Sequence, residues 1–395
     1  MEGGVGGAGS QSATAPARPR ERVATLASLA FGNFLGYAGL VNAPFWVGAV
    51  VANWNVSASA AGFVASMEFA CFGIASLVAA VFVVRADRRF LAYLGLALAL
   101  LGELGSFLAP NMVVLTVARS FGGVGEGVVL AAVNAAAAGT SNVQRSFAII
   151  AFALAGLGVA CHSLTPLAID TVGPKGVFAL LIGLKALGFV ILIALPRHAG
   201  PEARVARRFE FKPEILSTLC AYGLFMAGGM SLWSYFERIG HARGLSLAII
   251  VSVIAAGDLC ALLGPVAADV LGVRYGRRVP LMLALFVTGT STLLVLLPFK
   301  LVGFASGEIL FTIGGQFCIV FFMSLLAELD PSGRTVAGSP AFMSLGTVIG
   351  PAVAGLSIAR FGVLSAVPVS FGFHLLAVLL IAAMAWTAST RAAAS

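Results

Sequence analysis

Charged side chains are scarce in this sequence. Only 10% of its 395 residues are Asp, Glu, Lys or Arg, whereas a soluble domain carries about 25%. Apolar residues make up 59% of the chain, and the mean hydropathy is +1.01. A water-soluble fold of this length needs far more polar surface to cover its core. The composition therefore excludes a soluble enzyme and a disordered chain, and it predicts that lipid surrounds most of the protein.

Cysteine pairs and metal-ligand spacings are also missing. The five cysteines lie singly inside apolar runs, without a Cys-x-x-Cys pair. An odd number without ligand spacing supports neither a disulfide framework nor a zinc site. We expect the cysteines to be buried small hydrophobic residues and expect no metal, cofactor or catalytic site. Because the sequence has no phosphate-binding loop or nucleotide-binding domain, transport driven by ATP is not expected either.

Long apolar runs dominate what is present. A helix crosses the hydrocarbon core in about 20 residues, and the runs are too continuous for the alternating strands of a membrane barrel. The sequence predicts an all-α polytopic membrane protein with twelve transmembrane helices. The predicted spans are 23–51, 58–84, 90–108, 112–138, 145–169, 176–196, 214–238, 245–271, 279–298, 301–327, 335–359 and 363–388.

The basic residues predict how the chain is oriented. Seventeen of them lie in the two tails and in the loops on the same side, against five in the opposite loops and span ends. The positive-inside rule then places both termini in the cytoplasm. The net charge of +8 is explained by this bias, so no nucleic acid is expected as a partner. A composition rich in Ala, Gly and Arg favours the inner membrane of a bacterium. We expect the protein to be a monomer.

The longest predicted loop divides the chain into two blocks of six spans. We expect a disordered cytoplasmic tail over 1–21, a first six-helix bundle over 22–196 and a basic cytoplasmic linker over 197–213. A second bundle then covers 214–389, and 390–395 form a tail. Two six-span halves are the architecture of one large class of secondary transporters.

Short arginine-rich turns occupy equivalent places in the two halves. The loop after the second span contains Asp87 and Arg88. The loop after the eighth span contains Arg274, Gly276, Arg277 and Arg278. The plainer interpretation is that both loops only obey the positive-inside rule. Both nevertheless resemble the loop G-x-L-A-D-R-x-G-R-R of the major facilitator superfamily, in which these loops help to hold the two halves together on the cytoplasmic side.

The fourth span strengthens this resemblance. Residues 119–125 read Arg-Ser-Phe-Gly-Gly-Val-Gly, similar to the superfamily pattern R-x-x-Q-G-x-G, and residues 346–351 resemble its G-x-x-x-G-P pattern. The resemblance covers residues 22–389. It implies two pseudo-symmetric six-helix bundles and transport by alternating access. It also implies that spans 1, 4, 7 and 10 line the central cavity most directly.

Ionisable groups within spans need an explanation, because each costs at least about 2.5–3.5 kcal/mol at mid-membrane. Candidates for proton coupling are Glu126, Asp258, Glu308 and His162. For Glu126, a satisfied structural carboxyl is the alternative interpretation, and for His162 a satisfied core histidine. Arg119 must meet an acid or an anion, so it either pairs with Glu103 in the neighbouring span or binds substrate.

Polar and aromatic groups on the same spans suit a small-ligand site with mostly apolar walls. The candidates for the substrate cavity are Arg119, Asn33, Tyr37, Glu68, Met226, Met230, Trp233 and Gln316. Lys185 is expected to pair with an acid of a neighbouring span, and His374 to be peripheral.

The sequence thus predicts a secondary transporter for a small molecule, coupled to protons and exporting small amphipathic compounds. Proton-coupled uptake of an organic anion, held by Arg119, is the alternative transport function. A membrane scaffold or sensor that does not transport is the alternative outside this class, and a membrane-embedded enzyme is the least favoured.

Overall fold

A computed structural model describes residues 19–83, 86–138, 140, 143–197, 212–271, 274–330 and 334–394. These residues form helices and turns, with no strand among them. Within these ranges, twelve helical segments are long and apolar enough to cross a membrane. The predicted all-α fold with twelve spans is confirmed.

The helices of the first bundle are α1 (Pro19–Val41), α2 (Ala43–Trp54), α3 (Ala58–Phe82), α4 (Arg88–Leu108), α5 (Met112–Ala138), α6 (Val143–Val172) and α7 (Gly176–Ile191). Those of the second bundle are α8 (Pro213–Trp233), α9 (Phe236–Ala242), α10 (Leu247–Cys260), α11 (Leu263–Leu271), α12 (Arg278–Leu293), α13 (Lys300–Leu329), α14 (Arg334–Phe361) and α15 (Ala366–Ala394). Short 3₁₀ turns follow α7, α12 and α14.

Several predicted boundaries differ from the structure. The span predicted over 23–51 is broken at Asn42, where α1 ends and α2 begins with Pro44 in its first turn. Proline lacks the amide hydrogen that a continuous helix needs, whereas the first turn of a new helix does not use it. The spans predicted over 214–238 and 245–271 are broken as well, after Trp233 and Cys260. At the other end of the chain, α15 runs to Ala394, through most of the predicted tail 390–395. Most of the predicted tail 1–21 and linker 197–213 lies outside the described residues.

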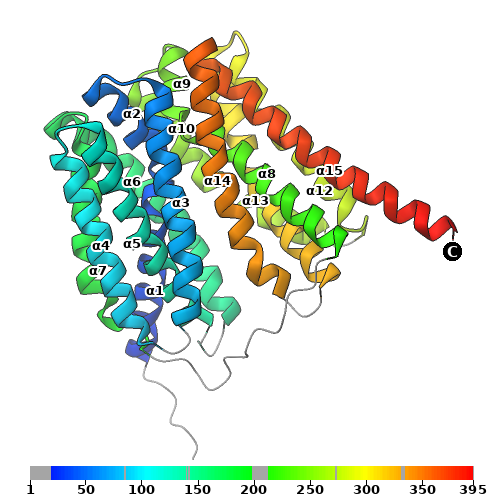
Figure 1. Cartoon of the computed structure of the whole chain (residues 1–395), viewed down its shortest axis with the longest axis horizontal. Coiled ribbons are helices and arrows are strands. Elements are labelled where there is room, and N and C mark those ends of the chain that lie inside the picture. Colours follow the sequence, from blue (N-terminus) through cyan, green and yellow to red (C-terminus); the bar gives the residue numbers. More distant parts are fainter. Residues whose placement is uncertain are drawn as a thin grey trace, which may run out of the picture.

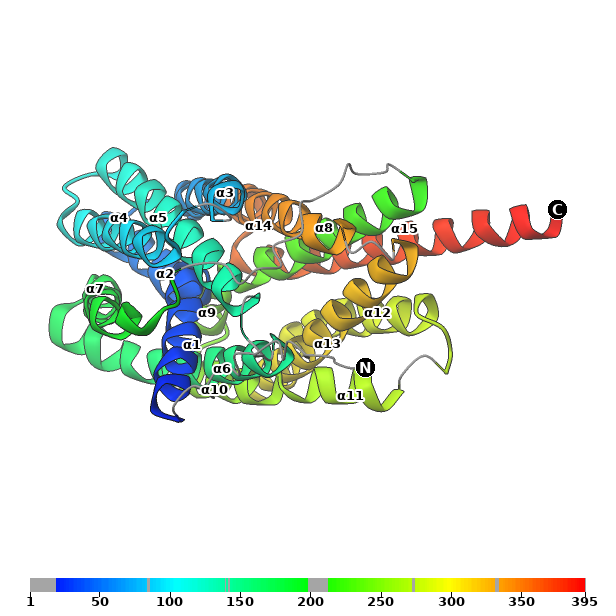
Figure 2. The ribbon, with the colours of Figure 1, turned by 90° about the horizontal axis from the view of Figure 1, so that it is seen from below.

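The helices form two bundles that meet along two helix pairs (Figure 1). The closest packing between the bundles is that of α3 with α14 and of α6 with α10. Figure 2 shows that α3 lies beside α14, and α6 beside α10, at the boundary between α1–α7 and α8–α15. In Figure 1 the bundles lie together at the end that carries α2 and α9, and their helices diverge toward the opposite end. We refer to the first as the α2–α9 end.

A glycine-rich stretch lets α5 approach two neighbours at once. A Cβ atom on Gly125 would collide with the backbone of α4 at Gly95 and Ala99, and one on Gly123 or Gly127 would collide with the backbone of α3. Glycine is the residue that allows backbones to come this close within a membrane. The Arg-Ser-Phe-Gly-Gly-Val-Gly stretch therefore brings α3 and α4 within reach of the polar side chains of α5.

Candidate functional site

Five charged side chains from four helices meet inside the first bundle. This buried charge cluster consists of Glu68 on α3, Glu103 on α4, Arg119 and Glu126 on α5, and Lys185 on α7. Arg119 Nε donates to Glu68 Oε2 at 2.8 Å, Nη2 donates to the other oxygen of the same carboxylate, and Nη1 donates to Glu103 Oε2 at 2.8 Å. Lys185 Nζ donates to Glu103 Oε1 at 2.5 Å and to Glu126 Oε1 at 2.7 Å. Every member is thus bonded to at least one group of opposite charge.

The surroundings of Arg119 leave it no access to solvent. Its side chain is fully buried, and its Cζ lies 4.6 Å from the ring centroid of Trp46 and 5.7 Å from that of Phe178. The expected pairs of Arg119 with Glu103 and of Lys185 with an acid of a neighbouring span are both present. This geometry favours the structural interpretation of Arg119 over binding of a substrate anion.

The cluster also touches the end of α1. The amide of Gly39 donates to Glu126 Oε1 at 3.0 Å and to Oε2 at 3.1 Å. A Cβ at this position would collide with oxygens of Glu68 and Glu126. Two carboxylates therefore lie against the last turn before the break at Asn42.

A second polar contact joins the two bundles. His162 Nδ1 on α6 lies 2.9 Å from Asp258 Oδ2 on α10, and His162 Nε2 lies 3.2 Å from the carbonyl oxygen of Val41. Because a carbonyl only accepts hydrogen bonds, Nε2 carries its hydrogen. The bond from Nδ1 to Oδ2 then needs one further proton, on the ring or on the carboxyl group. Making both hydrogen bonds at once therefore takes one proton more than a neutral ring and a carboxylate carry.

Two aromatic side chains bridge the bundles near this contact. Trp233 Nε1 on α8 donates to the carbonyl of Leu40 at 3.0 Å, and its ring centroid lies 6.1 Å from that of His162. The Tyr235 hydroxyl lies 3.1 Å from the carbonyl of Ala58 on α3 and 3.0 Å from that of Pro351 on α14. Together with the packing of α2 against α9, these bonds hold the α2–α9 end closed.

Glu308 on α13 is the exception among the buried acids. Its side chain is 1% exposed, and neither carboxyl oxygen has a hydrogen-bond partner. It lies against Gly257 on α10, where a Cβ would be 3.1 Å from Glu308 Oε1. Asp258 follows directly in the sequence and is close enough to interact with Glu308 electrostatically.

The remaining cavity candidates lie apart from these groups. Asn33 Nδ2 donates to Asn134 Oδ1 at 3.0 Å, which ties α1 to α5. The ring of Tyr37 lies 6.0 Å from that of Phe72. Met226, Met230 and Gln316 belong to the second bundle; Met230 is buried in the core at the α2–α9 end, Met226 packs against Gly346, and Gln316 packs against Gly264. His374, expected to be peripheral, is fully buried and bonded to the Ser370 carbonyl of its own helix.

In the two arginine-rich loops, the contacts described below lie within the loop's own bundle. Asp87 accepts from the amide of Phe90 at 3.1 Å and caps α4, and Arg197 Nε lies 3.8 Å from the same carboxylate. Arg88 donates its amide hydrogen to the carbonyl of Arg197 at 2.9 Å. In the second loop, Arg277 bonds to Ser324 and Glu328 of α13, between Gly276 in the left-handed region and Arg278 at the start of α12. Arg274 is exposed.

Three residues that contribute to these sites were not predicted from the sequence: Trp46, Phe178 and Gly39. Trp46 stacks on Arg119 and donates to the carbonyl of Gly39 at 2.8 Å, and the ring of Phe178 on α7 lies 5.7 Å from the guanidinium carbon. Proline at the third position of Asn-Ala-Pro is a signal for a helix start, so the break that places Trp46 here could have been found. No pattern in the sequence marks Phe178 or Gly39 among so many similar residues.

Comparison with known proteins agrees with this architecture. The sequence pattern of the Major Facilitator Superfamily matches residues 27–339, and no curated protein sequence matches the chain. The nucleoside transporter NupG superposes with a TM-score of 0.73 at 12% identity, over 92% of this chain and 98% of that one. A bacterial homologue of the human lysosomal transporter Spinster gives 0.74 at 14% identity, over 94% and 98%. The POT family transporter PepTSo gives 0.74 at 14% identity, over 95% and 99%.

Identities this low show a common fold and nothing about the substrate. The family match is different, because it extends over more than half of the sequence and agrees with the twelve spans and two bundles. The chain belongs to the major facilitator superfamily of membrane transporters, and its fold is that of a secondary transporter that works by alternating access.

Proposed function

We propose that this transporter couples the entry of protons to the export of small amphipathic compounds. The observation that carries the coupling is the contact between His162 and Asp258, an imidazole and a carboxyl group that join the two bundles. Loss of one proton from a pair that makes both hydrogen bonds would leave the ring a single N–H, which could serve Asp258 or the carbonyl of Val41 but not both. A protonation step and a step of the alternating-access cycle would then be the same event.

The groups around this contact restrict where its proton can go. The ring of His162 lies between the rings of Phe45 and Trp233, with centroids at 5.3 and 6.1 Å. The Asp258 side chain is 22% exposed, whereas that of His162 is fully buried. Proton exchange with water is therefore proposed to take place through Asp258, while His162 holds the proton against the end of α1.

The proposed substrate class follows from the walls at the boundary of the bundles. The core that joins them at the α2–α9 end is apolar and contains residues of both, such as Phe45, Val47, Met230 and Phe236. These side chains pack against one another in the closed state, so a ligand would meet them only once the bundles separate, and would then need a large apolar part. Compounds of this kind enter cells through lipid without a carrier, so a carrier for them serves to remove them. Export follows on this reasoning, with both termini in the cytoplasm and the chain in a bacterial inner membrane.

The alternative, uptake of an organic anion through Arg119, finds less support. Arg119 already binds two carboxylates and is fully buried. If it nevertheless binds the substrate, Arg119→Lys should weaken binding of anions far more than that of neutral analogues. A non-transporting scaffold or sensor would show no substrate-dependent flux in purified vesicles.

The proposal is tested with purified protein in proteoliposomes that carry an imposed pH gradient and a panel of amphipathic dyes. We expect the wild type to accumulate a dye against its gradient. Asp258→Asn keeps a hydrogen-bonding side chain but removes the titratable group, so it should still allow downhill flux and lose the accumulation. Asp170→Asn, at an exposed carboxyl near the end of α6, is the matched control. Accumulation at the wild-type rate by Asp258→Asn would contradict the proposal.

A further inference from the structure

A groove of about 390 Å³ lies between α10 and α13, on the side of the second bundle that faces away from the first. Its lining residues are Ala248, Ile249, Ser252, Val253 and Ala256 on α10 and Leu301, Ala305 and Ile309 on α13. On the other side of α10, Ile250 and Ile254 are buried in the core that joins the bundles at the closed end. Because Ile249 and Leu301 are exposed, the groove opens toward lipid and not toward the boundary of the bundles.

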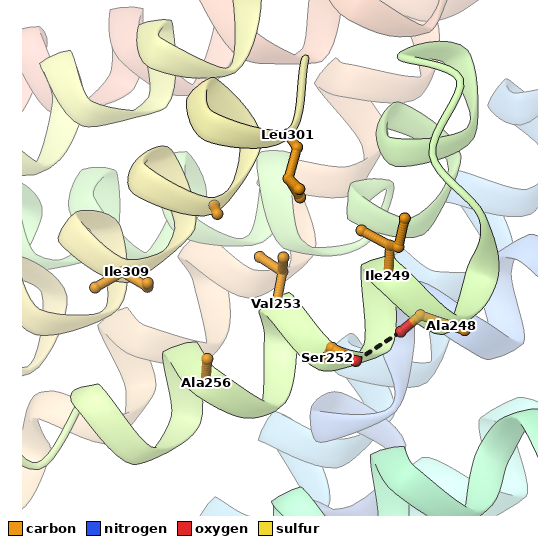
Figure 3. Close-up of a pocket in the computed structure, with 8 residues that line it drawn as sticks. Ala248, Ile249, Ser252, Val253, Ala256, Leu301 and Ile309 are labelled. Carbon is orange, nitrogen blue, oxygen red and sulfur yellow. Dashed lines mark hydrogen bonds between the residues drawn. The ribbon is translucent and has the colours of Figure 1, made fainter. Parts of the chain in front are cut away.

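The walls of the groove are apolar. Its single hydroxyl, that of Ser252, donates to the carbonyl of Ala248 in the same helix at 2.8 Å (Figure 3). Figure 3 shows Ile249 and Leu301 toward one end of the groove and Ile309 toward the other. A ligand would therefore meet hydrocarbon along the whole length of the groove and no free hydrogen-bonding group.

The groove has the length and the position of a single lipid chain. It follows α10 from Ala248 to Ala256, which is about 12 Å of helix. The span that contains α10 begins at Leu247, so the groove starts where the chain enters the membrane. The hydrocarbon core is about 30 Å thick, or about 15 Å for each leaflet. An acyl chain of the leaflet at the α2–α9 end thus fits the groove along its axis.

Two cationic side chains lie at the entrance of the groove. Lys300 precedes the lining residue Leu301, and its Nζ lies 3.4 Å from the position that a Cβ on Gly244 would occupy. The neighbouring Arg243 donates from Nη2 to the carbonyl of Leu297, in the turn before α13. The two positive charges therefore come together at the adjoining turns from which α10 and α13 begin.

Neither cation has a carboxylate partner in the part of the chain that the structure describes. The buried Nε of Arg243 has no hydrogen-bond partner, and Lys300 forms no ion pair with a described residue. The nearby acid Glu237 is bonded to His241 instead. Two positive charges without a counter-ion at the mouth of an apolar groove attract a ligand that is anionic at one end and apolar along the rest.

We propose that the groove binds an acyl chain of an anionic phospholipid, whose phosphate lies between Lys300 and Arg243. The charges favour an anionic over a zwitterionic headgroup, because the ammonium of a zwitterionic lipid would come beside two cations that lack a carboxylate. Bound lipid would fill the space beside α10, the helix that packs against α6 of the first bundle. The assignment involves neither the transported compound nor the contact of His162 with Asp258, so it does not depend on the proposed function.

The test is retention of phospholipid by purified, delipidated protein in detergent, counted by native mass spectrometry. Phosphatidylglycerol and phosphatidylcholine with the same acyl chains are compared. The wild type should retain one phosphatidylglycerol, with a preference of at least about tenfold. The double variant Arg243→Gln, Lys300→Gln should lose this preference. Lys175→Gln, which removes a cation that lies over the ring of Trp54, should keep it. Equal retention of both lipids by the wild type, or an unchanged preference in the double variant, would overturn the assignment.

A second set of variants tests the groove itself. Ser252→Trp fills it from α10 and should reduce retention of phosphatidylglycerol while both cations remain. Ala256→Leu, a smaller obstruction, should reduce it less, and Val302→Trp, at an exposed position outside the lining, should leave it unchanged. Size-exclusion chromatography verifies that each variant is folded. Retention at the wild-type level in both Ser252→Trp and Ala256→Leu would show that the headgroup alone is bound and would contradict the place given to the acyl chain.

Thermal midpoints in detergent give an independent readout. Added phosphatidylglycerol should raise the midpoint of the wild type and of Lys175→Gln, but not that of the double variant, because only a ligand of the folded state stabilises it. Without anionic lipid, Lys300→Gln should unfold at the same temperature as the wild type, since its ammonium has no described partner. A rise of equal size in all of these proteins would show that the lipid acts without this site.

Discussion

His162 on α6 and Asp258 on α10 form a hydrogen bond of 2.9 Å between the two bundles, and the other ring nitrogen of His162 lies 3.2 Å from the carbonyl oxygen of Val41. The same turn of α1 is held by Trp233, whose indole donates to the carbonyl of the preceding residue, Leu40. Side chains of the second bundle thus form hydrogen bonds with the first bundle close to the break at Asn42. Closure of the α2–α9 end depends on hydrogen bonds to carbonyls that an unbroken helix would have used internally.

Trp233→Phe should loosen this end of the molecule. It removes one hydrogen bond between the bundles, worth about 1 kcal/mol, so the open state should become about fivefold more populated. The measurement is the rate of maleimide labelling of Ser66→Cys in a background without the five native cysteines, because Ser66 is buried between the bundles and bonds to the carbonyl of Val348.

Trp46→Phe is the matched control for this experiment. The Trp46 indole donates to the neighbouring carbonyl of Gly39 within the first bundle. Its loss should lower thermal stability without changing the labelling rate at position 66. Equal acceleration in both variants would show that the bond between Trp233 and Leu40 has no special part in closure.

Lys185→Met should destabilise the first bundle strongly. It leaves Glu103 with one cation and Glu126 with none, and loss of one partner of a buried ion pair costs about 3–5 kcal/mol. The free energy of unfolding is measured by chemical denaturation in bicelles, with Lys300→Met at an exposed helix start as the control. Adding Glu126→Gln to Lys185→Met should recover part of the loss, and a double variant no more stable than the single one would contradict the arrangement.

Gly39→Ala should also destabilise the protein, through the same cluster. The added methyl group would collide with carboxylate oxygens of Glu68 and Glu126, and overpacking of this kind costs about 1–3 kcal/mol. Gly183→Ala on α7 is the control, because nothing lies within 4 Å of a Cβ there. Thermal midpoints in detergent decide between them, and a midpoint for Gly39→Ala at or above that of Gly183→Ala would show that the cluster does not press on α1.

A separate pH effect, on the stability of the fold, is expected from His241 at the α2–α9 end. The pKa of His241 is raised, first by its hydrogen bond to Glu237, with partial burial and, less strongly, Arg238 opposing. A raised pKa in the folded state stabilises the fold below the unfolded value of about 6.5, and this contribution is lost as the pH rises through the folded value. Because the His241 side chain is 46% exposed, the contribution should be only about 0.3–0.5 kcal/mol.

Thermal midpoints of wild type and His241→Gln test this at pH values well below and well above the histidine range. The wild type should be the more stable protein only under the acidic condition. A difference between the two proteins that does not change with pH would rule out the protonated pair.

The sequence predicted the twelve spans because lipid requires long apolar helices, and each of these leaves a continuous run. It also predicted the pairs of Glu103 with Arg119 and of Lys185 with an acid, since buried charges in lipid need partners. The sequence could not show which residues of different helices lie close together. The contact of His162 with Asp258 joins residues almost a hundred positions apart, and nothing in either local sequence selects the other. The break at Asn42 was missed because apolar residues continue through Ala43 and Pro44, so hydropathy alone shows one span.

Glu308 shows the same limit for a group that lacks a partner. A mid-span acid suggested proton coupling, but only the packing against Gly257 shows that no base is near it. Likewise, Arg119 matched a motif of the family, yet its role depends on Glu68 and Trp46, which come from other helices.

The most direct test of the central claim, that one proton between His162 and Asp258 closes the contact between the bundles, is a distance measurement across the α2–α9 end. Spin labels at Asn53→Cys and Ala242→Cys occupy exposed sites on either side of it, and the distance distribution is recorded from mildly acidic to alkaline pH. If protonation of this pair closes the contact, longer distances should gain population as the pH rises, and Asp258→Asn should abolish this change. A distribution that does not change with pH in the wild type, or that changes equally in Asp258→Asn, would contradict it.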